Sequence, residues 1–179
     1  MRYRADHRSA AYLAPVALLL SVAVILGYVE SVVLPPLPVP GLRLGLANIA
    51  VVVALATFGL RAAVIVSLGR VFLIALALGT LGGPTFVLSL GGALAALALM
   101  AVLSRAGSTF SVVGWSVAGS AAHVSAQLAV AVLIVGSNSP LLLMPVALGL
   151  SVPLGLAVGH IARLLLSRIP DWSLSAAGR

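Results

Sequence analysis

Six polar residues lie within or beside long apolar stretches of this 179-residue chain, and their types favour ligand binding over catalysis. The six are Glu30, Arg43, Asn48, Arg70, His123 and Gln127. Together they provide a carboxylate, two guanidinium groups, two amides and an imidazole. Such groups are costly in apolar surroundings unless they are hydrogen-bonded, so each needs a reason to be there. We predict that these residues form a substrate-binding site without a catalytic group or a bound metal.

Glu30 and Asn48 each have a structural alternative to ligand binding. Glu30 precedes a proline-rich segment, and it either borders a site beneath that segment or is an interfacial carboxylate that caps loop backbone. Asn48 follows Arg43 by five positions. A single asparagine in a membrane helix often hydrogen-bonds between helices. Its location near Glu30 and the first loop raises the alternative that it borders the site, where Arg43 and Arg70 would suit an anionic group.

Arg70 lies about halfway along an apolar stretch. A guanidinium at that depth costs at least ~2.5–3.5 kcal/mol even on the lenient insertion scale, so it should face protein or a wet cavity. It either ties to helix carbonyls or organises a site, and we favour the second role.

His123 and Gln127 are four positions apart in a later apolar stretch, and therefore share one helix face. They form either a hydrogen-bonded pair between helices or a polar stripe that faces a ligand. His160 lies near the end of the last stretch, where we expect its ring to reach the membrane interface.

The chain lacks the residues that most membrane enzymes require. Binding magnesium against a diphosphate needs clustered carboxylates, but the only acids are Asp6, Glu30 and Asp171. There is no cysteine and no glycine-rich phosphate loop, so the chain itself should not hydrolyse ATP. Ser120 and His160 could suggest a serine hydrolase, but serine–histidine pairs occur by chance in any chain. We predict no enzyme activity and no cofactor.

The elements that hold these residues are apolar segments of membrane-spanning length. Hydrophobic residues make up 62% of the chain and charged residues 7%, which is too little polar surface for a soluble protein. We predict an all-α membrane protein with one transmembrane domain over residues 1–179. Its six spans cover about 11–33, 44–60, 62–80, 86–104, 113–135 and 141–166. Pro145 and Pro153 predict a kink in the sixth span. The segment 34–41 contains four prolines and should form a stiff loop.

The positions of the arginines predict how the chain is oriented in the membrane. With six spans, one side of the membrane carries Arg2, Arg4, Arg8, Arg61, Arg105, Arg163, Arg168 and Arg179, and the other carries Arg43 alone. Positive charge marks the cytoplasmic side, so both termini should be cytoplasmic in a multi-pass plasma membrane protein. The formal net charge of +7 forms no basic face, which argues against nucleic acid as a partner.

Three motifs resemble a known membrane family. They are Tyr28-Val-Glu-Ser31 with the proline-rich segment, Gly41-Leu-Arg-Leu-Gly-Leu-Ala-Asn48, and Gly119-Ser-Ala-Ala-His-Val-Ser-Ala-Gln127. The family is called Gx transporter or heptaprenyl diphosphate synthase component I, and it is similar to S components of energy-coupling factor transporters. The resemblance covers roughly Leu13 to Leu166. Val124 departs from it, because the family pattern often has asparagine there.

The resemblance implies a six-helix S-component-like fold, an outward ligand pocket and a first loop that acts as a gate. It also implies a small-molecule ligand and, as partners, a separate transmembrane coupling subunit and ATPase subunits. The synthase name implies an alternative, a noncatalytic component I that assists the catalytic subunit of a prenyl synthase. A membrane scaffold without a ligand is a third hypothesis. A binding protein predicts one cavity bordered by the polar residues, whereas a scaffold predicts that they satisfy one another.

Overall fold

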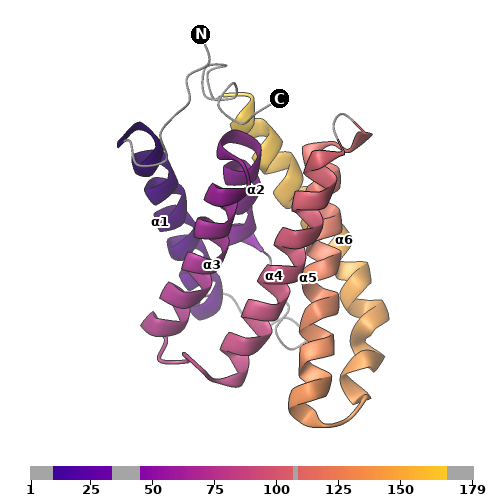
Figure 1. The fold of residues 1–179 in the computed structure, drawn as a ribbon. Coiled ribbons are helices and arrows are strands. Elements are labelled where there is room, and N and C mark those ends of the chain that lie inside the picture. The colour runs from indigo at the N-terminus through magenta and orange to yellow at the C-terminus, as the bar shows by residue number, and fades with distance from the viewer. Residues whose placement is uncertain (1–9, 34–44, 107–108, 169–179) are drawn as a thin grey trace.

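The computed structural model describes residues 10–33, 45–106 and 109–168, and these residues are helical apart from short turns. The elements are α1 (Ala10–Val32), α2 (Leu46–Phe58), α3 (Leu60–Ala77), α4 (Pro84–Arg105), α5 (Val112–Val135), the short 3-10 helix η2 (Ser139–Leu143) and α6 (Met144–Leu166) (Figure 1). The predicted all-α fold is therefore confirmed for the described residues. The helices begin and end within a few residues of the predicted spans.

Five of the described helical segments are long and apolar enough to cross a membrane. They are Tyr12–Val32, Leu60–Ala77, Pro84–Arg105, Val112–Val135 and Ser139–Leu166. The remaining helix, α2, has only 13 residues, which corresponds to about 20 Å at 1.5 Å per residue. It is shorter than the predicted span 44–60 because a glycine with positive φ stands at each end, Gly45 at +79° and Gly59 at +80°. Six complete crossings therefore stay a prediction.

The short helix α2 is the most enclosed element of the bundle. Every residue from Ile49 to Leu55 is buried, and α2 packs against α1, α3 and α6. Its valines, alanines and leucines therefore contact other helices rather than lipid, and they form much of the core.

The backbones of α5 and α6 lie very close to each other at two glycines of α6. A Cβ added to Gly155 would lie 2.7 Å from the Cα of Val117, and one added to Gly159 would lie 2.8 Å from the Cα of Val113. Real side chains do not approach a backbone atom so closely, so glycine is needed at both positions for this packing.

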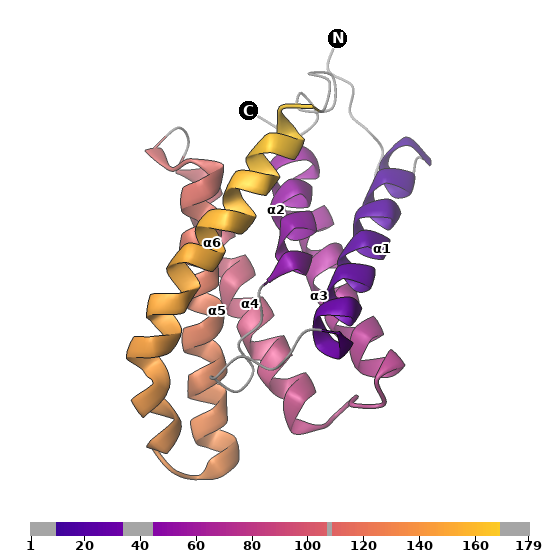
Figure 2. The ribbon, with the colours of Figure 1, turned by 180° about the vertical axis from the view of Figure 1, so that it is seen from behind.

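Of the two prolines predicted to kink α6, one lies inside the helix and the other lies at its start. Pro145 is in the first turn of the helix, where proline fits without losing a helical hydrogen bond. Pro153 is inside the helix and removes one internal donor. Figure 2 shows α6 changing direction along its length.

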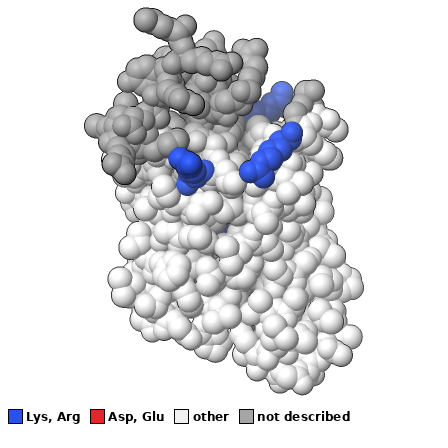
Figure 3. Space-filling model, viewed as in Figure 1, with Lys and Arg blue, Asp and Glu red and all other residues white. Residues whose placement is uncertain are grey.

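The two ends of the bundle differ in charge. The start of α1 and the end of α6 lie at the same end of the molecule (Figures 1 and 2). Exposed arginines gather there, at Arg61, Arg105, Arg163 and Arg168. Figure 3 shows the arginines visible from one side near that end, while the rest of this face is uncharged. A face with so little charge suits contact with lipid tails.

Candidate functional site

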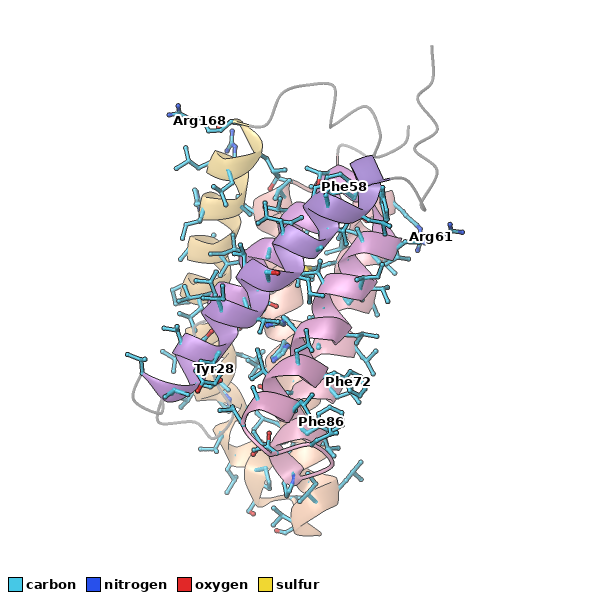
Figure 4. All side chains as sticks on the ribbon, turned by 90° about the vertical axis from the view of Figure 1, so that its left-hand side faces the viewer. Tyr28, Phe58, Arg61, Phe72, Phe86 and Arg168 are labelled. Atoms are coloured by element: carbon cyan, nitrogen blue, oxygen red, sulfur yellow. The ribbon has the colours of Figure 1, made fainter. Side chains whose placement is uncertain are left out.

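A cavity of about 60 Å³ lies between the helices. It is lined by the C-terminal part of α1, the start of α2, the second half of α3, the start of α4 and the middle of α5. These segments lie away from the arginine-bearing end. In Figure 4, Phe86, which lines the cavity, and Tyr28 lie far from the labelled Arg61 and Arg168. The volume exceeds the ~10–15 Å³ that one water molecule needs.

Glu30 connects α1 to the start of α2 at the edge of this cavity. The backbone N–H of Gly45 donates a hydrogen bond of 2.7 Å to Oε1 of Glu30, whose side chain is only 6% exposed. Gly45 is in the left-handed region, which glycine adopts without strain. The carboxylate also lies at the positive end of the α2 dipole, which stabilises its negative charge. Glu30 therefore both caps backbone and borders the cavity.

Arg70 connects α3 to α2 across the same cavity. Nη2 of Arg70 donates a hydrogen bond of 2.6 Å to Oδ1 of Asn48, which lies in the first turn of α2. A hydrogen bond to a charged group typically contributes about 1.5–3 kcal/mol. This bond goes to a side-chain amide rather than to a helix carbonyl, and the 9% exposed Arg70 also lines the cavity. Arg70 therefore both links α3 to α2 and borders the cavity.

One face of α5 forms the opposite wall. Ser120, His123 and Gln127 all line the cavity, and their spacing of three and four residues places them on one side of the helix. Gly92 of α4 makes room for two of them. A Cβ there would lie 2.8 Å from Cε1 and Nε2 of His123 and 2.9 Å from Cγ of Gln127. Any larger residue at position 92 would push these two side chains out of their present positions.

Gln127 is a buried amide that borders the cavity. Its side chain is 5% exposed, and it lies one turn after His123 on the same face of α5. A buried amide needs hydrogen-bond partners, and water or a ligand in the cavity can supply them.

Five of the six predicted site residues border this one cavity. They are Glu30, Asn48, Arg70, His123 and Gln127. Arg43 and the proline-rich segment 34–41 lie outside the described residues. That these residues bind a ligand stays a prediction, but their convergence from α1, α2, α3 and α5 is a feature of the fold.

Several cavity residues were not predicted from the sequence. They are Thr80, Thr85, Phe86 and Ser89 near the α3–α4 turn, and Ser120 on α5. Ser120 is three residues before His123, so extending the polar stripe by one turn would have found it. The α3–α4 group carries no comparable periodic signal.

The residues of the cavity do not form a recognisable catalytic set. His160, which would have to pair with Ser120 in a hydrolase, is exposed on α6 and has Nδ1 2.8 Å from the carbonyl oxygen of Leu156. Within residues 10–33, 45–106 and 109–168, no three His, Cys, Asp or Glu residues are grouped closely enough to hold a metal.

The fold and cavity define a class, an all-helical protein with membrane-length apolar helices around a buried polar site. The family described as Heptaprenyl diphosphate synthase component I matches residues 19–165, and the chain belongs to this family. Neither the curated proteins nor the solved structures give a match to the chain. The family and the apolar helices together identify a membrane component.

Proposed function

We propose that the chain is the substrate-binding membrane subunit of an uptake transporter of the energy-coupling factor type. The observation that carries this proposal is the convergence of Glu30, Asn48, Arg70, His123 and Gln127 on one cavity. In this scheme the cavity captures a small molecule. A separate transmembrane coupling subunit and ATPase subunits supply the energy, since the sequence has no phosphate-binding glycine-rich loop.

The bonding pattern favours a binding protein over a scaffold. A scaffold would use its polar residues to satisfy one another, as Arg70 and Asn48 do. Gln127 instead borders the cavity, where its buried amide can bind a ligand or water. Polar groups this costly in a membrane commonly mark a substrate pathway.

We also propose how the bundle is oriented in the membrane. The exposed Arg61, Arg105, Arg163 and Arg168 gather at one end of the bundle, and positive charge favours the cytoplasmic side. Both termini are then cytoplasmic in the plasma membrane, all six helices cross it or insert into it, and the cavity lies in the outer half. Outside is where an uptake system must capture its substrate.

The family description favours a second function, a noncatalytic component that assists a prenyl synthase. Such a component needs a docking surface for the catalytic subunit rather than an internal site. The cavity of about 60 Å³ has room for only a few non-hydrogen atoms, so it could not enclose a long prenyl chain. The buried polar residues would then have no part in the synthase reaction.

Purification from membranes in mild detergent, followed by mass spectrometry, distinguishes the two functions. We expect ATPase and coupling subunits to copurify, together with a small molecule that the Arg70→Leu variant loses. Arg105→Leu is the matched control, because Arg105 is exposed and lies outside the cavity. Thermal unfolding of each variant checks that it is folded. Copurification of a prenyl synthase, with no small molecule that depends on Arg70, would favour the accessory function instead.

A further inference from the structure

We propose that molecules enter this cavity from water through the seam between α3 and α4, and that Phe86 is the side chain that limits their size. This inference rests on the proposed function and specifies the route of the substrate and its class, a small water-soluble molecule. It follows from the exposure of the residues that line the cavity, from the packing of α4 and from an aromatic contact across the seam.

The wall of the cavity reaches the surface of the protein at the start of α4. Thr85, in the first turn of α4, lines the cavity and is exposed. Three other lining residues of this region, Thr80, Phe86 and Ser89, are partly exposed. The lining residues of α1 and α3 are all buried. The cavity is therefore closest to solvent, within the described part of the chain, where α4 begins.

The packing of α4 leaves the seam with α3 less filled than the seam with α5. α4 contacts α5 along much of its length and contacts α3 far less. The turn that joins α3 to α4 contains Gly79 and Gly82, whose φ values are +67° and +78°. A Cβ added to either glycine would have no atom within 4 Å. Few side chains therefore close the space beside this turn.

One aromatic contact spans the seam at the cavity. Phe86 of α4 lines the cavity, whereas Phe72 of α3 does not line it and is 47% exposed. The centroids of their rings are 5.1 Å apart, with an angle of 66° between the planes, which is an edge-to-face arrangement. Figure 4 shows the two labelled rings beside each other. Phe72 therefore holds the ring of Phe86 at the border of the cavity.

The polarity and size of the entrance define what can pass. Thr80, Thr85 and Ser89 offer hydroxyl groups, which can donate and accept hydrogen bonds as a polar molecule loses its water. The α3–α4 turn lies at the end of the bundle opposite the arginines, which is the outer end in the proposed orientation (Figure 1). Because the cavity of about 60 Å³ encloses only a few non-hydrogen atoms, the entrance suits a small solute rather than a lipid.

A thiol placed inside the cavity tests the route without knowledge of the ligand. The chain has no cysteine, and Ser120 lines the cavity from α5, so Ser120→Cys supplies a single internal thiol. Its reaction with iodoacetamide, a small water-soluble reagent, is followed by mass spectrometry of the intact protein in detergent. Adding Thr85→Trp should slow the reaction several-fold, because the larger side chain fills the entrance. Val87→Trp should not change it, because Val87 is exposed on the same helix but does not line the cavity.

Two further variants test the role of the aromatic pair. Phe86→Ala should speed the reaction several-fold and should also admit N-ethylmaleimide, a larger reagent. Phe72→Ala should have a smaller effect in the same direction, because Phe86 keeps its ring but loses the contact that positions it. Leu73→Ala, at an exposed neighbour of Phe72 that does not line the cavity, is the matched control. Thermal unfolding checks that each variant is folded, and Phe86→Leu and Thr85→Met serve if the larger changes prevent folding.

The inference is wrong if Thr85→Trp leaves the rate unchanged, if Val87→Trp slows the reaction equally, or if Phe86→Ala does not speed it. These results do not decide the proposed function. A small molecule that copurifies with transporter subunits and depends on Arg70 would still support a binding subunit, whose substrate would then enter elsewhere. Conversely, a prenyl synthase that copurifies without such a molecule would contradict the proposed function even if the thiol reacts through the α3–α4 seam.

Discussion

The arginine-bearing end of the bundle and the cavity end are built from the same helices but packed in different ways. At the arginine end, small and medium apolar side chains fill the space. The buried cluster there includes Tyr12 and Val16 of α1, Val66 of α3, Met100 of α4 and Ala162 of α6. At the cavity end, the same helices present polar groups and leave about 60 Å³ open.

The contrast is sharpest along α2, which contributes to both ends. Its C-terminal part, from Val51 to Leu55, is fully packed in apolar surroundings. Its first turn instead supplies Asn48 to Arg70, and its N-cap Gly45 bonds to Glu30. The close-packed end gives the polar end a rigid support, which holds the cavity residues in a defined geometry.

The prediction with the largest expected effect concerns which end of the helix bundle faces the outside of the cell. The chain has no cysteine, so single cysteines can be introduced without background. Ser137→Cys, in the exposed turn after α5, should be fully labelled by an impermeant thiol reagent in intact cells. Thr109→Cys, exposed between α4 and α5 at the arginine end, should be labelled only after permeabilisation. The physical reason is the strong preference of arginine-bearing loops and helix ends for the cytoplasmic side. The reverse labelling pattern would place the cavity end in the cytoplasm.

The second prediction tests the packing that supports the close-packed end. Gly159→Ala should lower the free energy of unfolding by about 1–3 kcal/mol, because the new methyl group would overlap the backbone of Val113. Gly149→Ala, on the same helix with no atom within 4 Å of the added carbon, should be neutral or slightly stabilising. Denaturation in detergent measures both variants. Equal stabilities would mean that the α5–α6 contact adjusts without cost.

The sequence was sufficient to predict the helical fold and five of the residues that meet at the cavity. Long apolar segments have few structural solutions in a membrane, so helix positions follow from hydropathy and turn residues alone. Arg70 and Gln127 were identifiable because isolated polar groups in such segments must find partners, water or a ligand. His123 was identifiable for the same reason, and it lies on the face of α5 that lines the cavity.

Other features depend on contacts between distant segments, which the sequence does not encode locally. The bond from Arg70 to Asn48 joins positions 22 residues apart and required the packing of α2 on α3. Thr80 and Ser89 reach the cavity through the α3–α4 turn, and neither residue type is unusual enough to stand out in the sequence. Spacing alone does not distinguish Gly155 and Gly159 from a chance pair, yet both allow close contact with α5.

The last prediction compares two adjacent glycines of α4. Gly91→Ala and Gly92→Ala each add one methyl group 2.8 Å from a side-chain atom of α5, so their costs in stability should be similar. The α5 residues that the two methyl groups would contact differ in their position relative to the cavity. The methyl at Gly91 meets Val130, which does not line the cavity, while the methyl at Gly92 meets His123 and Gln127, which do.

Gly92→Ala should therefore displace part of the α5 wall and weaken binding of the copurifying small molecule several-fold, which corresponds to about 1 kcal/mol. Gly91→Ala should lower the thermal midpoint to a similar extent but leave the affinity of the folded protein unchanged. Mass spectrometry of the small molecule that each purified variant retains, run beside thermal unfolding, separates these effects. If both variants lost affinity equally, general loosening of α4 against α5 would be the cause. The positions of His123 and Gln127 would then not determine binding.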